Sequence, residues 1–314
     1  WLDSSIVSRM PPMTRHLFVD MPSGAAGDML MAALCDLGVS LTPLRRALDS
    51  MGLGAVELVC EAVDVGALRA RRFSVREGHA HGVDHHHRSF RDIRALLDKA
   101  EVPRLARGRA LAMFRRLAEA EAHAHGVDVE EVHFHEVGAV YSIADILGLA
   151  LALEELSVEA VSASVPLVGQ GLIASQHGPL PLPAPATLHC LQGLPLRRLE
   201  VEAELTTPTA ACFLATQVDG FGAPPEMVLE RVGVGAGSRS LPDRPNLLRV
   251  WLGESDEGRQ EQEWQIQTNV DDMPGEHLAY LMEGLLAAGA HDVWFTPVSM
   301  KKSRPAVVLG MLCD

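Results

Sequence analysis

The sequence predicts an α/β (α+β) protein in which a large N-terminal mixed α/β domain is followed by a small βαββ domain. Over residues 13–252, short apolar runs of strand length alternate with apolar residues at helical spacing. A polar, mostly acidic stretch at 253–263 is typical of a linker, and residues 264–314 carry strand, helix, strand and strand patterns in that order. Residues 1–12 show no clear periodicity, and we expect a disordered extension there.

The small domain is expected to be ferredoxin-like and incomplete. A two-layer domain of this kind normally adds a further helix and strand to cover its sheet, whereas the pattern here stops at the second of two consecutive strands. We therefore expect residues 264–314 to form a truncated domain.

Composition excludes some classes of function. The chain has 314 residues, of which 47% are hydrophobic and 22% charged, and its formal net charge is -14. Nucleic acids and anionic membranes are bound by basic faces, so neither is an expected partner. No run of about 18 apolar residues is present, as a membrane helix needs. The five cysteines form no Cys-x-x-Cys pair, which indicates buried free thiols and a cytoplasmic protein.

The N-terminal domain begins with a strand, a turn of small residues and a helix. Residues 17–19 are apolar and predict a short buried strand that ends at Asp20. Ser-Gly-Ala-Ala-Gly at 23–27 predicts a turn, and the helix expected at 28–37 ends before Gly38. The further elements expected along the chain are helices at 43–51, 103–125, 143–156 and 275–288, and strands at 56–59, 231–234, 247–252, 264–270, 292–298 and 306–312.

Three segments have distinctive patterns. The helix at 143–156 is so apolar that most of its faces must be buried, and Ser142 and Asp145 are expected to form its capping box. Residues 178–185 include four prolines, which favour a rigid turn or an extended wall. Residues 231–237 resemble a strand that runs into a glycine loop.

Histidines cluster between residues 79 and 135, where nine of the fourteen lie. Neutral imidazole is a ligand for nickel, zinc, copper and iron. In an extended segment His133 and His135 would point to the same face, with Glu136 as a base or a further ligand. The alternative is a pair of buried histidines bonded to backbone or carboxylate groups. The candidate metal contacts are His81, His85, His86, His87, His133 and His135.

The segment 77–89 is a polar, His-rich loop without apolar periodicity. It is compatible with capture of nickel or zinc, and equally with loose metal binding that has no catalytic role. His123 and His125 lie at a helix C-terminus, where a positive charge is favoured whatever the function, so a structural role is preferred. The acids four residues earlier, Glu119 and Glu121, can reach them along the helix.

Several polar groups are candidates for binding anions or divalent cations. Asp20 and Asp28 flank the turn at 23–27, where backbone N–H groups can meet an anion and carboxylates can hold a cation. Asp28 could instead be an acid favoured by the helix dipole. Thr207 and Thr209 place hydroxyls on a Thr-Pro turn that could grip phosphate or carboxylate oxygens.

A second group of candidates lies in the small domain. Lys301, Lys302 and Arg304 make a basic patch between two strands, as phosphate binding requires. Asp271 and Asp272 precede a helix and could hold a divalent cation for the same nucleotide. A solvated basic loop and an acidic helix start are the alternative.

Taken together, these segments resemble the nickel insertase family of nickel-pincer cofactor biosynthesis, known as LarC. The resemblance extends from residue 17 to the C-terminus. The matching blocks are Asp20–Met29 (Asp-x-x-Ser-Gly-x-x-Gly-Asp-Met), His133–Ala139, His177–Thr187, Thr207–Thr209, Gly235–Gly237, Asn269–Met273 and Met300–Pro305. Where the family usually has Asp and Gly, this chain has Tyr141 and Ala210.

The resemblance implies a lyase-type chelatase that inserts nickel into pyridinium-3,5-bisthiocarboxylic acid mononucleotide, with CTP as co-substrate and Mg or Mn assisting. It implies that residues 13–252 handle nickel and the precursor, with Asp20, Asp28 and Glu136 as catalytic residues. Residues 264–314 would bind CTP, and the chain could form a homo-oligomer. The alternatives are a nickel-storage or delivery protein without turnover, and a metal-dependent hydrolase built on Asp20, Asp28 and the His-x-His-Glu run.

Overall fold

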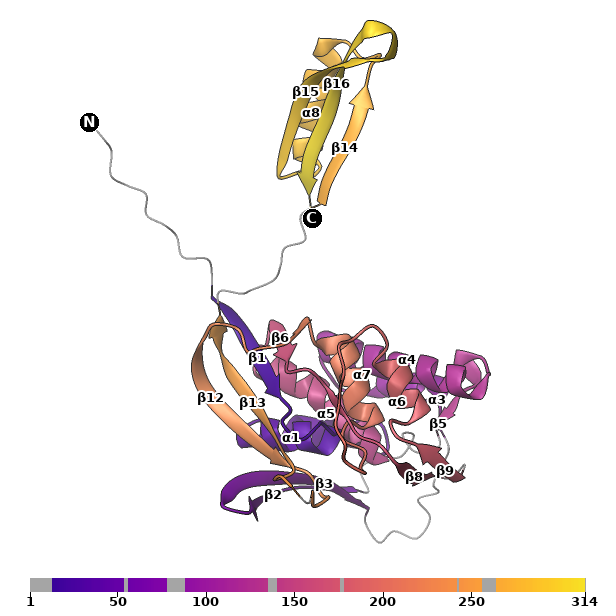
Figure 1. The fold of residues 1–314 in the computed structure, drawn as a ribbon, viewed down its shortest axis with the longest axis vertical. Coiled ribbons are helices and arrows are strands. Elements are labelled where there is room, and N and C mark those ends of the chain that lie inside the picture. Colours follow the sequence, from indigo (N-terminus) through magenta and orange to yellow (C-terminus); the bar gives the residue numbers. More distant parts are fainter. Residues whose placement is uncertain are drawn as a thin grey trace, which may run out of the picture. The chain divides into compact units, whose positions relative to one another are not determined.

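The computed structural model describes residues 13–53, 56–77, 88–134, 140–175, 178–241, 243–255 and 264–313 (Figure 1). The chain divides into two compact units between Gly258 and Arg259, within the segment expected to be a linker. Residues 1–12, for which we expect disorder, lie outside the described part, as do residues 78–87 of the His-rich segment.

The larger unit is built on a mixed seven-stranded sheet. Its interior strand β1 pairs in parallel with β6 and antiparallel with β13 and is buried over residues 16–19, so the predicted buried strand at 17–19 is confirmed. In sheet order the strands are β11 (Gly220–Phe221), β6 (Ala160–Ala163), β1 (Thr14–Asp20), β13 (Leu247–Ser255), β12 (Met227–Ala236), β3 (Leu68–Glu77) and β2 (Val56–Val65). β13 runs three residues into the expected linker because Glu254 and Ser255 pair with Arg15 and Thr14.

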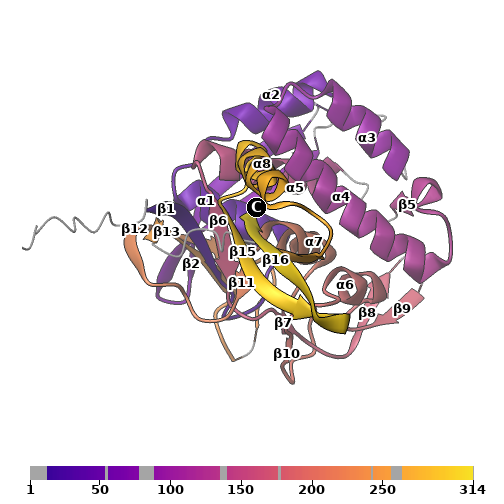
Figure 2. The same ribbon diagram turned by 90° about the horizontal axis from the view of Figure 1, so that it is seen from above.

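The helices of this unit gather on one side of the sheet, as Figures 1 and 2 show. α1 packs on β12, β3 and β13, and α5 packs between α1 and α4. The helices are α1 (Gly27–Asp36), α2 (Thr42–Ser50), α3 (Phe90–Lys99), α4 (Arg104–His125), α5 (Val140–Glu155), α6 (Pro185–Cys190) and α7 (Pro208–Gln217).

Helix α5 forms the centre of the core, and thirteen of its sixteen residues are buried. The expected burial of this apolar segment is therefore confirmed. The expected capping box is wrong, because the helix already includes Val140, and Ser142 and Asp145 lie within its first turns with 2% and 8% exposure. The burial of the Asp145 side chain therefore needs an explanation other than helix capping.

Two glycines of β12 let α1 rest directly on the sheet. A Cβ atom at Gly233 would lie 2.0 Å from the carbonyl oxygen of Ala33, and one at Gly235 would lie 2.0 Å from that of Met29. Residues two apart in a strand share a face, so both glycines face the helix. The glycine loop expected after this strand begins only at Gly237, because Gly235 belongs to the strand.

The remaining short elements flank the helices. The proline-rich segment forms strand β9 (Gly178–Pro181), a cis Leu182–Pro183 peptide and the start of α6, in agreement with an extended wall. The other short elements are β4 (Arg88–Ser89), η1 (Val129–Glu131), β5 (His133–Phe134), β7 (Leu167–Val168), β8 (Leu172–Ser175) and β10 (Arg197–Arg198).

The smaller unit has the predicted βαββ order. β14 (Trp264–Val270) precedes α8 (Gly275–Ala287), which is followed by β15 (Asp292–Met300), η2 (Lys301–Ser303) and β16 (Arg304–Cys313). β16 is the middle strand and pairs antiparallel with both neighbours. The ferredoxin-like assignment stays a prediction.

Two further expectations can be compared with the structure. The five cysteines are free thiols, of which Cys190 and Cys212 are buried and the others half-buried. Within the described ranges, none of the helices combines the length and apolar character that crossing a bilayer requires.

The close contact of α1 with β12 gives a test of stability. We expect Gly235→Ala to lower the free energy of unfolding by about 3 kcal/mol, because its methyl group collides with backbone rather than with a movable side chain. Gly108→Ala is the control, because its Cβ, in the second turn of α4, meets no atom within 4 Å; it should raise stability by about 1 kcal/mol. Urea unfolding followed by circular dichroism measures both, and equal effects would contradict the packing described.

Candidate functional site

A pocket of about 350 Å³ lies where the first turns of three helices meet. α1, α5 and α7 each present their N-terminal residues to it, and β3 closes one side. Helix N-termini carry partial positive charge, so the pocket favours negative groups. Its lining includes Gly27 and Asp28 of α1, Tyr141, Ser142 and Asp145 of α5, Thr207, Pro208 and Thr209 at the start of α7, the Phe73–Val75 segment of β3, and Glu204.

Backbone hydrogen bonds between two turns create this meeting point. Ala25 N donates to Leu205 O at 2.8 Å, and Thr207 N donates to Ala25 O at 3.0 Å, so the turn at 23–27 runs beside the turn at 205–207. Gly24 has a φ of +96°, and a Cβ there would lie 2.0 Å from Leu205 O. The glycine is therefore required both for the turn and for the close approach.

The Thr-Pro-Thr turn begins α7. Thr207 is the N-cap, and its Oγ1 accepts a hydrogen bond from Ala210 N at 3.4 Å. Thr209 is buried in the first turn and lines the pocket. Ala210, which stands where the family usually has Gly, has helical geometry and a fully buried methyl group. Alanine lacks the conformational freedom of glycine, but the helical backbone at this residue does not need that freedom, and alanine favours the helix that forms here.

Asp28 and Asp145 form a pair of acids in the pocket. Asp145 comes from the apolar helix α5, and its Oδ2 would lie 2.6 Å from a Cβ added at Gly27. Burial raises the pKa of Asp145 well above its ordinary value, and the negative charge of Asp28 raises it further. The neutral, protonated form of Asp145 is thus favoured in the folded protein.

Burial also raises the pKa of Asp28, but other groups oppose the shift. Asp28 Oδ1 accepts a hydrogen bond from Met29 N at 2.9 Å, and the charge of Arg72 acts in the same direction by lowering the pKa. The pair can therefore hold one proton and one negative charge, which is the arrangement of a group that exchanges protons with a bound molecule.

The oxygen donors of this pocket fit a hard cation better than nickel. Carboxylate and hydroxyl oxygens suit Mg or Mn, whereas nickel favours imidazole or thiolate. Mg typically takes one or two carboxylates and completes its shell with water or phosphate oxygens, so Asp28 and Asp145 could hold it together with a ligand. Among the described residues, no group of three or more His, Cys, Asp or Glu side chains is arranged to hold a metal ion.

Asp20 lies apart from Asp28. It ends β1, and its Oδ2 accepts a hydrogen bond from Arg249 Nε at 2.8 Å within an ion pair. It lines a different pocket, of about 480 Å³, that also contains Arg197 and Arg244. The expectation that the two acids flank one turn holds along the chain, but the structure does not bring them into one pocket. A catalytic role for Asp20 stays a prediction.

Strands β4 and β5 pair residues that adjoin the two histidine-rich parts of the sequence. Arg88 pairs with Phe134 and Ser89 with His133. Arg88 directly follows the histidine-rich segment, and Phe134 directly precedes His135 and Glu136. The predicted contacts His81, His85, His86, His87, His135 and Glu136 lie outside the described residues, so of this set only His133, which is exposed, is placed.

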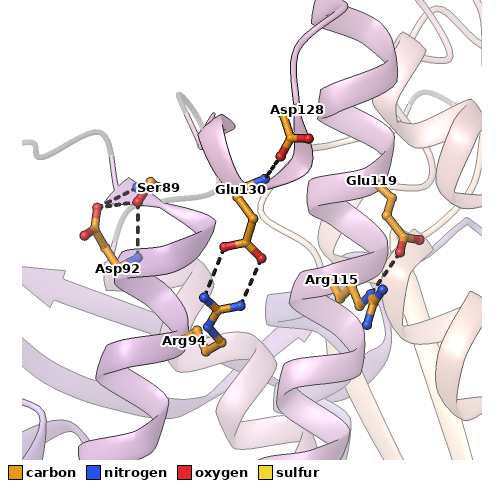
Figure 3. Close-up of polar contacts among 7 residues, drawn as sticks. All are labelled: Ser89, Asp92, Arg94, Arg115, Glu119, Asp128 and Glu130. Carbon is orange, nitrogen blue, oxygen red and sulfur yellow. Dashed lines mark hydrogen bonds and ion pairs between the residues drawn. The ribbon is translucent and has the colours of Figure 1, made fainter.

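Ion pairs hold this corner of the molecule in place, as Figure 3 shows. Ser89 and Asp92 form a capping box at the start of α3, and the positive charge of His133 helps to lower the pKa of Asp92 after the hydrogen bonds from Ser89. Arg94 donates to both carboxylate oxygens of Glu130, at 2.9 and 3.1 Å. The η1 turn, which directly precedes β5, is thereby tied to α3.

The helix pairs expected on α4 form only in part. Glu121 lies 3.4 Å from His125, as expected. Glu119 instead pairs with Arg115, and the ring of His123 packs against that of His189 with 3.8 Å between centroids.

The nucleotide-binding candidates of the smaller unit lie at one edge of its sheet. Val270 pairs with Val307 and Met300 with Arg304, so the end of β14 and the turn from β15 to β16 are neighbours. Asp271 and Asp272 are exposed at the first place, and Lys301 and Arg304 are exposed at the second. Lys302 belongs to the same turn.

The pocket at the three helix N-termini is called the carboxyl pocket, after Asp28 and Asp145. Two of its lining residues are not among the functional candidates of the sequence analysis: the sequence pattern predicts a cap at Asp145, and Glu204 is not a candidate. A usable signal existed for Asp145, because an acid inside an otherwise apolar buried helix is rarely without a specific role. No local pattern marks Glu204.

Comparisons with known proteins agree with the resemblance. The chain matches the family model of the nickel insertion proteins over residues 17–314. The pyridinium-3,5-bisthiocarboxylic acid mononucleotide nickel insertion protein of Geobacillus kaustophilus is 42% identical over 313 residues, covering 94% of this chain and 76% of the relative. A Myxococcus xanthus protein that bears the family's name is 43% identical over 307 residues, covering 96% and 77%.

One solved structure is also similar in sequence. It is the apo form of the C-terminal domain of a cyclometallase involved in the synthesis of the NPN cofactor of lactate racemase. The identity is 52% over 17% of this chain and 36% of that chain, with a TM-score of 0.16.

The protonated acid predicts a pH dependence of stability. Folding raises the pKa of Asp145, so the folded state binds more protons than the unfolded chain above the ordinary aspartate pKa of 3.8. The free energy of unfolding should therefore fall as the pH rises from that value toward neutrality. Asp145→Asn should show a smaller fall, because an amide does not titrate there.

Urea unfolding between acidic and neutral pH, in buffer with a chelator, measures this difference in slope. Asp98→Asn, at an exposed position of α3, is the control and should follow the wild-type curve. A parallel curve for Asp145→Asn would show that its carboxyl group does not carry the buried proton.

Proposed function

The chain belongs to the nickel insertion protein family, and we propose that it inserts nickel into pyridinium-3,5-bisthiocarboxylic acid mononucleotide, the compound in the name of its Geobacillus kaustophilus relative. The observation that carries the proposal is the convergence of family blocks in one pocket. The block that ends at Asp28 and the block at Thr207–Thr209 are separated by almost 180 residues of sequence, and both line the carboxyl pocket.

The charges of the pocket suit such a substrate. The pyridinium nitrogen of that compound is cationic and can be met by an ionised Asp28, whereas its two thiocarboxylic acid groups are anionic at neutral pH and can accept a hydrogen bond from a protonated Asp145. Thr209 and Tyr141 add hydroxyl groups that can orient polar substituents of the ring.

We assign the nickel ion, which is cargo rather than a resident cofactor, to the histidines. Imidazole matches nickel better than the oxygen donors of the carboxyl pocket do. The pairing of β4 with β5 supports a common site for the two histidine-rich segments, because it joins their adjoining residues. Glu136 remains the candidate base or additional ligand.

We further propose that CTP activates the precursor and that the smaller unit binds it. Lys301, Lys302 and Arg304 would meet its phosphates, while Asp271 and Asp272 would hold Mg or Mn. Their common location at one sheet edge supports this assignment. The lyase class and the cytoplasmic location belong to the same proposal.

The hydrolase alternative is weakened by the separation of Asp20 from Asp28, since it required both acids at one centre. Nickel storage is the remaining alternative. Incubation of the purified protein with precursor, CTP, magnesium and nickel separates the two functions. We expect the nickel-containing product, detected by mass spectrometry; nickel uptake without product would instead establish storage.

Replacement of Asp28 gives a test of the pocket. Asp28→Asn keeps the shape of the side chain but removes its charge, so we expect the turnover of precursor to fall at least tenfold, roughly the effect of removing a positioned acid or base. Asp98→Asn should keep wild-type turnover. Wild-type turnover in Asp28→Asn would move the reaction away from this pocket.

Replacement of two histidines gives a separate test of nickel binding. We expect the double variant His133→Ala and His135→Ala to bind nickel about tenfold more weakly in an equilibrium titration, because two imidazole ligands are removed. The matched control replaces His277 and His291 of the smaller unit, and should leave the affinity unchanged. Equal affinity of the first variant and the wild type would contradict the assignment.

A further inference from the structure

A second pocket, which we call the arginine pocket, has a volume of about 550 Å³ and is lined by arginines although the protein is strongly acidic. It lies between the β2–β3 turn and the loop that follows β12. Arg72 of β3, Arg239 and Arg244 line it, together with the hydroxyl-bearing residues Ser238 and Ser240. Asp64 also belongs to the lining, but one acid against three arginines leaves the net charge of the pocket lining positive.

One arginine nitrogen is left without an acceptor. Arg72 Nε is buried, and it makes no hydrogen bond to any part of the chain that the structure describes. A buried N–H group without an acceptor is unfavourable unless something else accepts the hydrogen bond. Because Arg72 also lines the pocket, an anion bound there would be a natural acceptor. Arg244, by contrast, already donates to Asp243 Oδ2 from both Nε and Nη2.

The loop that carries Arg239 is closed by its own hydrogen bonds. Gly237 N donates to Asn246 O at 3.0 Å, and Asn246 Nδ2 donates to Arg239 O at 3.0 Å. A Cβ at Gly237 would lie 2.3 Å from Asn246 Nδ2, so a larger residue there would displace the Asn246 side chain that holds the loop. The two ends of the loop are thus fixed before any ligand binds, which lowers the entropic cost of binding.

We propose that this pocket binds the phosphate group of the mononucleotide substrate. The proposal rests on the proposed function, which supplies the identity of the phosphate ester. Guanidinium groups bind phosphate oxygens through paired N–H donors, and serine hydroxyls add further donors. The volume admits the phosphate together with part of the ribose.

Strand β3 connects this pocket with the carboxyl pocket. Arg72 lines the arginine pocket, and the next residues along the strand, Phe73, Ser74 and Val75, line the carboxyl pocket. The charge of Arg72 also acts on Asp28, where it opposes the rise in pKa that burial causes. The substrate carries a pyridinium ring with two thiocarboxylic acid groups at one end and an anionic phosphate at the other, and the arginines of the second pocket match the phosphate while the carboxyl pocket is left for the ring.

Isothermal titration with nicotinic acid mononucleotide tests the proposal. This compound is a pyridinium mononucleotide, and its riboside, which lacks the phosphate, is the companion probe. We expect the mononucleotide to bind the wild-type protein at least tenfold more tightly than the riboside does. Arg72→Gln and Arg239→Gln should each remove most of that difference. Arg69→Gln, at an exposed position on the same strand, should retain it.

Three results would overturn the proposal. They are equal binding of the mononucleotide and the riboside, undiminished binding by both variants, and no binding of the mononucleotide at all. Arg239 is exposed on a loop, so its variant keeps the test valid if Arg72→Gln fails to fold, which circular dichroism would reveal. A loss confined to CTP in a parallel titration would assign the arginines to the triphosphate and would also overturn it.

The insertion assay distinguishes failure of this site from failure of the proposed function. If the wild-type protein converts the precursor and both variants keep its KM, the phosphate site is wrong and the function stands. If the protein makes no product but its binding of the mononucleotide depends on these arginines, the site stands and the function is wrong.

Discussion

The hydrogen bonds between Ala25 and the turn at 205–207 are the constraint on which the candidate site depends. They join segments that are almost 180 residues apart and set the N-termini of α1 and α7 side by side. Side-chain contacts alone would define this arrangement less closely, because backbone bonds fix distance and direction together. Gly24 belongs to the same constraint, since any side chain there would strike Leu205.

Two opposing electrostatic effects meet at this junction. Three helix N-termini favour negative charge, whereas burial inside an apolar unit disfavours it. For Asp145 burial prevails, and the acid is held in its protonated form. For Asp28 a backbone N–H group and Arg72 offset part of the effect. The pocket thus holds a neutral acid beside a more easily ionised one, and a cation that enters it can change this balance.

Local sequence patterns predicted the elements whose burial is uniform. The buried strand β1 and the apolar helix α5 were of this kind, whereas the βαββ order of residues 264–313 was predicted although its elements are mostly exposed or half-buried. The long hairpin of β2 and β3 was predicted only at its first four residues. Many of its later residues are charged or only half-buried, and β2 is the edge strand of the sheet, so the hairpin lacks the regular apolar alternation that marks a half-buried strand.

The composition of the site was less predictable than the fold. Asp28, Thr207 and Thr209 could be chosen because each belongs to a recognisable block, but only the chain's long-range pairing shows that they share a pocket while Asp20 does not. The spacing of Asp145 from Ser142 fits a capping box, and the sequence pattern therefore predicts a cap there. A local pattern of this kind cannot reveal that the helix starts before Ser142, or that Gly27 packs closely against the side chain of Asp145.

Chain connectivity limits the distance between His133 and the carboxyl pocket. Tyr141 lines that pocket, and His133 of β5 precedes it by eight residues. Eight residues span at most about 28 Å when fully extended, so His133 lies within that distance of Tyr141. Nickel favours imidazole, and the cationic ring favours carboxylate, so these groups need separate but neighbouring positions. In a single site that contained both imidazole and carboxylate groups, the acids would also bind the nickel ion. They would then compete with the precursor for the metal.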